Sequence, residues 1–168
     1  MGKTSIILKI VNSIRGAGYE VGGMVSREVK ERGIRAGFEL EDLKTGRKGW
    51  LAHKEICRGP RIGKYFVNMK DLDNIGVGAI QKSLMNPKIN LIVIDEIGPM
   101  ELFSNNFVNA VRKAINNDKP LLGSIHGKSR HSLLDEIRTM DKISIITMNF
   151  ENRDHIHNDI SSKIINLI

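Results

Sequence analysis

The stretch INLIVIDEIGPME, residues 89–101, decides the fold of this chain. Its aliphatic run is typical of a strand that is buried on both faces of a parallel sheet. The run ends in two adjacent carboxylates, Asp95 and Glu96, and a Gly-Pro pair follows shortly after them. Because open α/β sheets bind ligands at the carboxyl ends of their strands, the acidic pair predicts a binding site at that edge. The alternative is that both acids only end the strand and face solvent.

Helical and strand-like patterns alternate on both sides of this stretch. After residue 71 the order helix, strand, helix, strand, helix, strand, helix indicates parallel strands joined by crossover helices. Before it, LKTGRKGW reads as the turn of a β-hairpin with Gly46 at the turn. We therefore predict an α/β fold, one domain over residues 1–168, with a mostly parallel sheet flanked by helices and a β-hairpin insertion. The predicted helices are 4–17, 72–85, 103–115, 130–138 and 154–168, and the predicted strands are 19–29, 38–43, 48–52, 64–68, 89–94, 121–126 and 142–147.

Composition and charge limit the classes of partner. The net charge of +7 and the pI near 9.6 favour anionic partners such as nucleotides, but no dense Lys/Arg block supports nucleic acid. No apolar run reaches the roughly 20 residues of a membrane span, so we expect no membrane partner. The one cysteine, Cys57, excludes an intramolecular disulfide and favours a cytoplasmic, reducing compartment. We expect Cys57 to be a buried, small apolar residue.

The first residues supply a second motif. Gly2, Lys3 and Thr4 match the last letters of the phosphate-binding loop G-x-x-x-x-G-K-[ST], the Walker A motif, and a helical pattern begins there. Lys3 would bring positive charge to the β- and γ-phosphates, Thr4 would give its hydroxyl to magnesium, and the helix amides would face the phosphates. Asp95 would then hold Mg²⁺ through water, as in a Walker B strand, and Glu96 would orient the attacking water. The two motifs together indicate a nucleotide site more strongly than either alone.

Further candidates for contact with the phosphates follow from position. The strand after the acidic one ends in GSIHG, so Ser124 or His126 could sense the γ-phosphate, although His126 could equally be an ordinary strand-end histidine. Phosphoryl transfer also needs positive side chains. Arg61, Lys64 and Arg153 are the candidates because they border Gly-rich or turn segments.

Five stretches together resemble the nucleoside-triphosphatases of the THEP1 type: GKTSII, GGMVSREVKERGIRAGFELEDLKTGRKGWLA, IGKYFVN, LIVIDEIGPMELFS and ENRD. They cover nearly the whole chain in order. The resemblance implies a RecA-like P-loop fold and Mg²⁺-dependent hydrolysis of ATP, GTP, CTP or UTP to the diphosphate and phosphate, with low base selectivity. It implies Lys3 and Glu96 as catalytic residues, Thr4 and Asp95 at the metal, and Arg153 near the base or phosphates. It also implies nucleotide contacts along Gly2, Lys3, Thr4, Ser5, Leu91, Ile92, Val93, Ile94, Asp95, Glu96, Ile97 and Gly98.

The sequence departs from that family at its start. Family members begin with a strand and then G-x-P-G-x-G-K-T, whereas Met1 stands here where the last variable residue of the loop would be. We expect the central first strand and the first residues of the loop to be missing. We favour a start codon placed too late as the explanation; the alternative is a degenerate protein that begins at Met1. We also expect the chain that begins at Met1 to bind nucleotide weakly, because the strand that holds Lys3 in place is absent.

Two other function classes stay open at this point. A nucleotide or nucleoside kinase is one, with residues 31–61 as a lid that excludes water. A non-catalytic nucleotide- or RNA-binding module is the other, but the 5% aromatic content gives few residues on which bases could stack. Transfer of labelled phosphate to an acceptor would favour the kinase, and salt-sensitive RNA binding without turnover would favour the module. The sequence specifies no oligomeric state.

Overall fold

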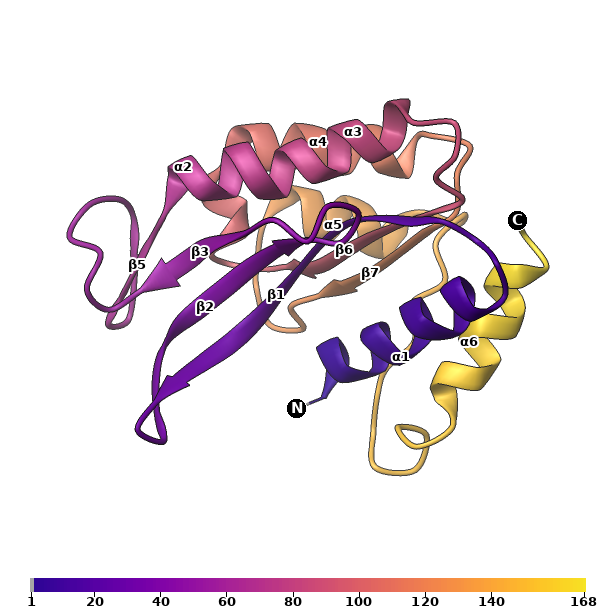
Figure 1. Ribbon diagram of the computed structural model, residues 1–168, viewed down its shortest axis with the longest axis horizontal. Helices are drawn as coiled ribbons and strands as arrows, with labels where there is room; N and C mark the ends of the chain where they lie inside the picture. The colour runs from indigo at the N-terminus through magenta and orange to yellow at the C-terminus, as the bar shows by residue number, and fades with distance from the viewer. Residues whose placement is uncertain (1) are drawn as a thin grey trace.

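The computed structural model describes residues 2–168, and it contains one seven-stranded sheet between two layers of helices (Figure 1). The strand order is β4-β5-β3-β2-β1-β6-β7. The strands are β1 (Val21–Glu31), β2 (Ile34–Asp42), β3 (Lys48–His53), β4 (Arg61–Ile62), β5 (Tyr65–Val67), β6 (Leu91–Ile97) and β7 (Leu121–Ile125). The helices are α1 (Lys3–Gly16), α2 (Met69–Asp71), α3 (Gly78–Met85), α4 (Asn105–Ile115), α5 (Ser132–Thr139) and α6 (Ile156–Ile165), with a π-helical turn η1 (Leu72–Val77) and a 3-10 turn η2 (Glu101–Phe103).

The sheet is mixed, and the prediction of a mostly parallel sheet is wrong. Only β1–β6 and β6–β7 pair in parallel among the described strands, whereas β1–β2, β2–β3, β3–β5 and β4–β5 pair antiparallel. The cause is the length of the connections, because a tight turn at Arg32 and Gly33 forces a hairpin, while parallel pairing needs a crossover of about a dozen residues or more. The hairpin around Gly46 is confirmed.

Alternating side chains of the strands feed two hydrophobic cores, one on each face of the sheet. On β6, Ile92 and Ile94 pack toward the core under α3, α4 and α5, whereas Leu91 and Val93 pack toward α1 and α6. Figure 1 shows these two helical layers on opposite sides of the sheet. This burial on both faces explains the unbroken aliphatic run in the sequence and confirms the predicted strand there.

The predicted strand at 142–147 is wrong. The chain there has no regular secondary structure and leads from α5 to α6, while β7 ends the sheet without a further partner. A strand needs a neighbour for its backbone hydrogen bonds, and this segment pairs with no described strand. As a result Ile145 and Ile146 are each 47% exposed. The expected absence of a central first strand stays a prediction.

The structure also bears on the burial of Cys57 and on membrane-spanning helices. Cys57 is an exposed free thiol, so the prediction that it is buried is wrong. It lies in the loop between β3 and β4, where most residues are exposed. Within residues 2–168, no helix combines the length and the apolar character that crossing a bilayer requires.

Candidate active site

The end of β6 places two carboxylates in different environments. The Cα of Asp95 pairs with that of Val25 on β1, and Asp95 is 1% exposed. The side chain of Glu96 is 28% exposed. Asp95 is therefore enclosed by the protein, whereas Glu96 can be reached from solvent. The two carboxylates are therefore suited to different tasks.

Asp95 is held by hydroxyl groups from two other elements. Thr4 Oγ1, in the first turn of α1, donates to Asp95 Oδ2 at 2.6 Å. Ser124 Oγ, on β7, donates to the other carboxylate oxygen. Burial raises the pKa of Asp95, while the hydrogen bonds from Ser124 and Thr4 and the charge of Lys3 act in the opposite direction. The structure thus brings the predicted residues Thr4, Asp95 and Ser124 together.

Lys3 links the same helix to the second carboxylate. Its Nζ donates to Glu96 Oε1 at 2.8 Å and to the carbonyl oxygen of Ile125 at 3.0 Å. The side chains of Lys3 and Glu96 are 38% and 28% exposed, so a ligand from solvent can reach both. The Lys3 ammonium can therefore exchange its bond to Glu96 or to the Ile125 carbonyl for a bond to a phosphate oxygen.

The start of α1 is open to an anion. Gly2 precedes the helix at a φ of 122° and provides no side-chain cap, and the first turn carries no acidic residue. Unpaired amides and the helix dipole favour negative charge at such an end. A Cβ placed on Gly2 would lie 3.9 Å from the side chain of Met148, so the segment that leads to Arg153 passes beside this helix start. Arg153 itself stacks over Phe150, with its guanidinium carbon 5.2 Å from the ring centre.

His126 follows the Ile125 carbonyl that Lys3 contacts. Its backbone N–H donates to the carbonyl oxygen of Ile97 at 3.1 Å, which ties the end of β7 to the end of β6. Ser129 N–H donates to His126 Nδ1 at 3.1 Å. The predicted sensor residues Ser124 and His126 therefore both adjoin the Asp95–Glu96 pair, one on the strand and one just after it.

Other predicted site residues lie elsewhere. Arg61 and Lys64 stand at β4 and beside β5, at the opposite edge of the sheet from β7, because β3, β2 and β1 intervene before β6. Ser5 directly follows Thr4 on α1, and its side chain is exposed. The strand residues taken from the family pattern are core residues, since their side chains pack inside the two hydrophobic clusters. These are Leu91, Ile92, Val93, Ile94 and Ile97.

Glu101 is a neighbour of the site that the sequence patterns do not reveal. It is 4% exposed, and burial together with the charges of Glu96 and Asp95 raises its pKa to about 8. Its Oε2 lies 3.2 Å from the point where a Cβ on Gly98 would stand, and Glu96 Cγ lies 3.4 Å from that point. Because Gly98 has no side chain, the side chains of Glu96 and Glu101 can approach each other beside it. The one signal in the sequence is a single acid inside the apolar run Met100–Phe103.

The oxygen donors of the site match a hard divalent cation. Among the described residues no group of three or more His, Cys, Asp and Glu side chains could hold a metal ion. Mg²⁺ usually binds one or two protein oxygens together with substrate phosphates and water. A hydroxyl and a carboxylate at contact distance, Thr4 and Asp95, fit that donor set.

A hollow of about 330 Å³ lies between the turn after β6 and the turn after β7. Pro99, close behind Glu96, and Ser129, which contacts His126, both line it. The rest of its wall mixes apolar and basic side chains, namely Leu102, Phe103, Arg130 and His131.

Comparisons with known proteins identify the family of this chain. A family model described as NTPase matches residues 1–161. The nucleoside-triphosphatase THEP1 of Thermofilum pendens is 41% identical over 100% of this chain and 92% of its own length. The THEP1 of Methanosarcina acetivorans is 38% identical over 98% of this chain and 91% of its own length.

Two solved structures share the fold. The crystal structure of THEP1 from Aquifex aeolicus matches with a TM-score of 0.81 and 27% identity, covering 98% of this chain and 93% of that one. The solution structure of a human cancer-related nucleoside triphosphatase matches with a TM-score of 0.82 and 30% identity, covering 98% and 92%. From the family match over residues 1–161 and these full-length similarities, the chain belongs to the NTPase family, as a nucleoside-triphosphatase of the THEP1 type.

Proposed function

We propose that this chain hydrolyses nucleoside triphosphates to the diphosphate and phosphate with low selectivity among ATP, GTP, CTP and UTP. The observation that carries the proposal is the network in which Lys3 bonds Glu96 while Thr4 bonds Asp95. It combines a cation, a hydroxyl and two carboxylates from the start of α1 and the end of β6. The THEP1 relatives, whose names describe nucleoside-triphosphatases, support the same activity.

The phosphates would sit at the start of α1. The backbone around Gly2, Lys3 and Thr4, with Ser5 in the first turn, supplies amides, and Lys3 supplies charge. Binding would transfer Lys3 from Glu96 to the phosphate oxygens. Glu96 would then be free to accept a proton from the attacking water, the task of a general base. Lys3 and Glu96 are thus the proposed catalytic residues.

Mg²⁺ is the proposed cofactor. Thr4 and Asp95 would hold it, Asp95 through water, and the ion would neutralise negative charge on the triphosphate. Ser124 would keep the Asp95 carboxylate in place, because its hydroxyl already bonds one of the oxygens. Glu101 would stay outside this coordination, buried behind Gly98.

Three further assignments belong to the proposal. The fold is a RecA-like P-loop domain with residues 1–168 as one unit, since a single sheet carries both cores. Ser124 and His126 would sense the γ-phosphate, and Arg153 would contact the nucleotide, which is supported by the closeness of Met148, on the segment that leads to Arg153, to Gly2. The compartment is the cytoplasm, where an exposed thiol such as Cys57 stays reduced.

Release of phosphate from the four triphosphates, measured with and without Mg²⁺, tests the function. Glu96→Gln should lower kcat by about 10²-fold or more, in the range of general-base catalysis, while nucleotide still binds in a direct titration. Glu39→Gln is the matched control, because Glu39 also pairs with a lysine, Lys48, at 2.8 Å but on the hairpin. Magnesium-dependent release that is equal in both variants would refute the role of Glu96. No release from the unaltered chain, at triphosphate concentrations high enough to overcome weak binding, would refute the function.

The hollow beside Pro99 favours one alternative, transfer of the γ-phosphoryl group to an acceptor other than water. A volume of about 330 Å³, lined in part by Pro99 and Ser129, suits a small acceptor molecule. Following labelled γ-phosphate from the triphosphate separates the two reactions. Label found only in inorganic phosphate supports hydrolysis, and label found in an organic product supports the transferase.

A further inference from the structure

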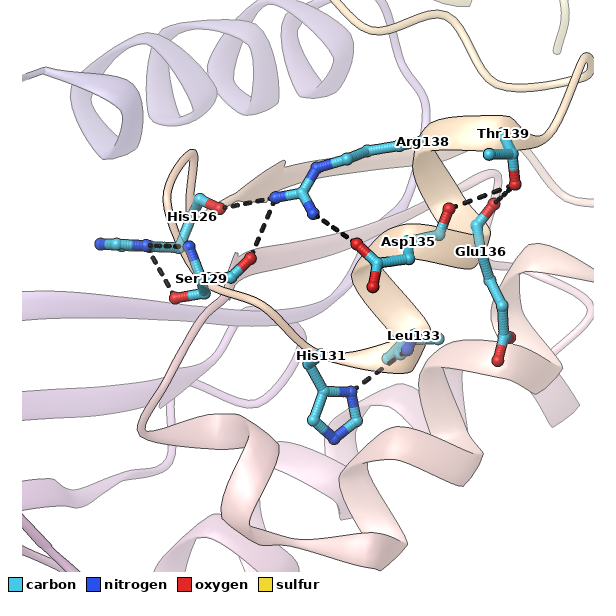
Figure 2. Close-up of polar contacts among 8 residues, drawn as sticks. All are labelled: His126, Ser129, His131, Leu133, Asp135, Glu136, Arg138 and Thr139. Carbon is cyan, nitrogen blue, oxygen red and sulfur yellow. Dashed lines mark hydrogen bonds and ion pairs between the residues drawn. The ribbon is translucent and has the colours of Figure 1, made fainter.

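The turn after β7 is fastened from α5. Arg138, in the last turn of α5, donates through one guanidinium nitrogen to the carbonyl oxygens of His126 at 3.3 Å and Ser129 at 3.2 Å. Its other terminal nitrogen donates to Asp135 at 3.0 Å. Figure 2 shows Arg138 reaching from the helix across to both ends of this turn. One side chain thus closes the loop from 126 to 129 and is itself fixed by a carboxylate one turn earlier.

The same turn controls the ring of His126. Ser129 N–H donates to Nδ1 at 3.1 Å, and Ser129 Oγ lies 2.8 Å from the same nitrogen. A nitrogen that accepts from a backbone N–H cannot carry a proton in the neutral ring. The proton of neutral His126 is therefore on Nε2, which makes Nε2–H a hydrogen-bond donor.

Backbone hydrogen bonds link this turn to the proposed site. Ile125, the preceding residue, receives the hydrogen bond from Lys3, and the backbone of His126 is bonded to Ile97 on β6. The turn is thus joined to the proposed site through its backbone at one end and to Arg138 along its length. A shift of this turn would move the His126 ring relative to Lys3.

We propose that Arg138 is a positioning residue that holds the 126–129 turn so that neutral His126 presents Nε2–H as a donor beside the phosphate site. The kinetic part of this inference rests on the proposed function, and the tautomer part does not. Arginine suits the role because its planar group can bond two carbonyls and a carboxylate at once, which the single ammonium of lysine does less well.

The tautomer is tested directly by proton–nitrogen correlation spectra of the labelled full-length chain at alkaline pH, where imidazole is neutral. His126 is assigned by comparison with His126→Gln. We expect a Nε2–H tautomer in the unaltered chain and a mixture of tautomers in Arg138→Ala. A Nδ1–H ring in the unaltered chain, or an unchanged ring in Arg138→Ala, would overturn the proposal.

Kinetics supply the second measurement. Arg138→Ala should lower kcat by about tenfold with little change in KM, since small displacements of a reacting group are costly. Arg112→Ala is the matched control, because it removes a bidentate ion pair with Glu136 on the same helix but does not touch the turn. Arg138→Lys should fall between the two, and it replaces Arg138→Ala if that variant does not fold. Equal losses of kcat in Arg138→Ala and Arg112→Ala would mean that Arg138 only stabilises α5 and does not position His126.

If the unaltered chain releases no phosphate, the proposed function fails. The spectra still decide whether Arg138 controls the His126 ring, so the two failures are distinguishable.

Discussion

Basic residues near the two edges of the sheet make different kinds of contact. At the β6 end, Lys3 contacts Glu96 and Ile125, which are 93 and 122 residues away in the chain. At the β4 end, Arg61 bonds the carbonyl of Gly63, two residues away, and Arg61 and Lys64 lie over the rings of Phe66 and Tyr65. Only the first arrangement gathers unlike groups from distant elements. A basic residue is therefore a good site candidate when the fold brings carboxylates and an open helix end to it.

Replacing Lys3 and Lys64 one at a time by methionine should show the largest difference between the two edges of the sheet. Lys3→Met should lower kcat/KM for triphosphate by about 10²-fold, because it removes a charged donor aimed at the developing charge. Lys64→Met should leave kcat/KM unchanged, since Lys64 contacts only a neighbouring ring. Phosphate-release kinetics on both variants give the comparison. Equal losses would mean that both ends of the sheet take part in catalysis.

Ser124→Ala probes the buried half of the site. It leaves a nearly fully buried carboxylate oxygen of Asp95 without its hydroxyl partner, which costs about 1–3 kcal/mol of unfolding free energy. Ser5→Ala, which removes an exposed hydroxyl on α1, should cost far less. Urea denaturation measures both. A Ser124 variant as stable as the Ser5 variant would show that the network does not hold Asp95.

Glu101 should make the stability depend on pH. Its pKa is raised from 4.5 to about 8 in the folded chain, so between those values the folded state keeps a proton that the unfolded state releases. The free energy of unfolding therefore falls as pH rises through this window, by up to about 1.4 kcal/mol per pH unit, and levels off outside it.

Glu101→Gln should remove this slope, as measured by denaturation at several pH values. Glu136→Gln is the control, because the pKa of Glu136 is lowered by its partner Arg112 and its loss leaves the slope in place. A slope that survives in Glu101→Gln would assign the titration to another group.

The smallest effect is expected at the β4 end. Arg61→Ala removes a bond to Gly63 and a contact with Phe66, both at the surface. Exposed contacts of this kind are worth roughly 0.5–1 kcal/mol at most, and catalysis should not change. Thermal unfolding and phosphate release on the same preparation check both statements. A clear loss of activity would make Arg61 a site residue after all.

The sequence predicts what local pattern controls and misses what depends on pairing. The buried strand around Asp95 and the hairpin at Gly46 are readable, because burial and turn chemistry are local signals. The segment 142–147 also has the pattern of a strand, but pairing needs a neighbour that no pattern in the segment itself specifies.

The same distinction holds for the site. Lys3, Thr4 and Asp95 belong to family-like motifs, so their residue types and spacing alone identify them as candidates. Glu101 also lies in a family-like stretch, but neither its burial nor the reach of Arg138 can be read from the sequence, because both arise only when distant elements pack together. An arginine in the last turn of a helix resembles an ordinary surface residue in sequence.

The open edge of β7 also bears on how this protein behaves in solution. An edge strand offers free N–H and C=O groups to another chain, and the segment after α5 adds exposed Ile145, Ile146 and Phe150. The net charge of +7 keeps the molecules apart at low ionic strength. Salt screens that repulsion, so light scattering should rise with ionic strength, and dilute, low-salt preparations are the ones in which kinetics report single molecules.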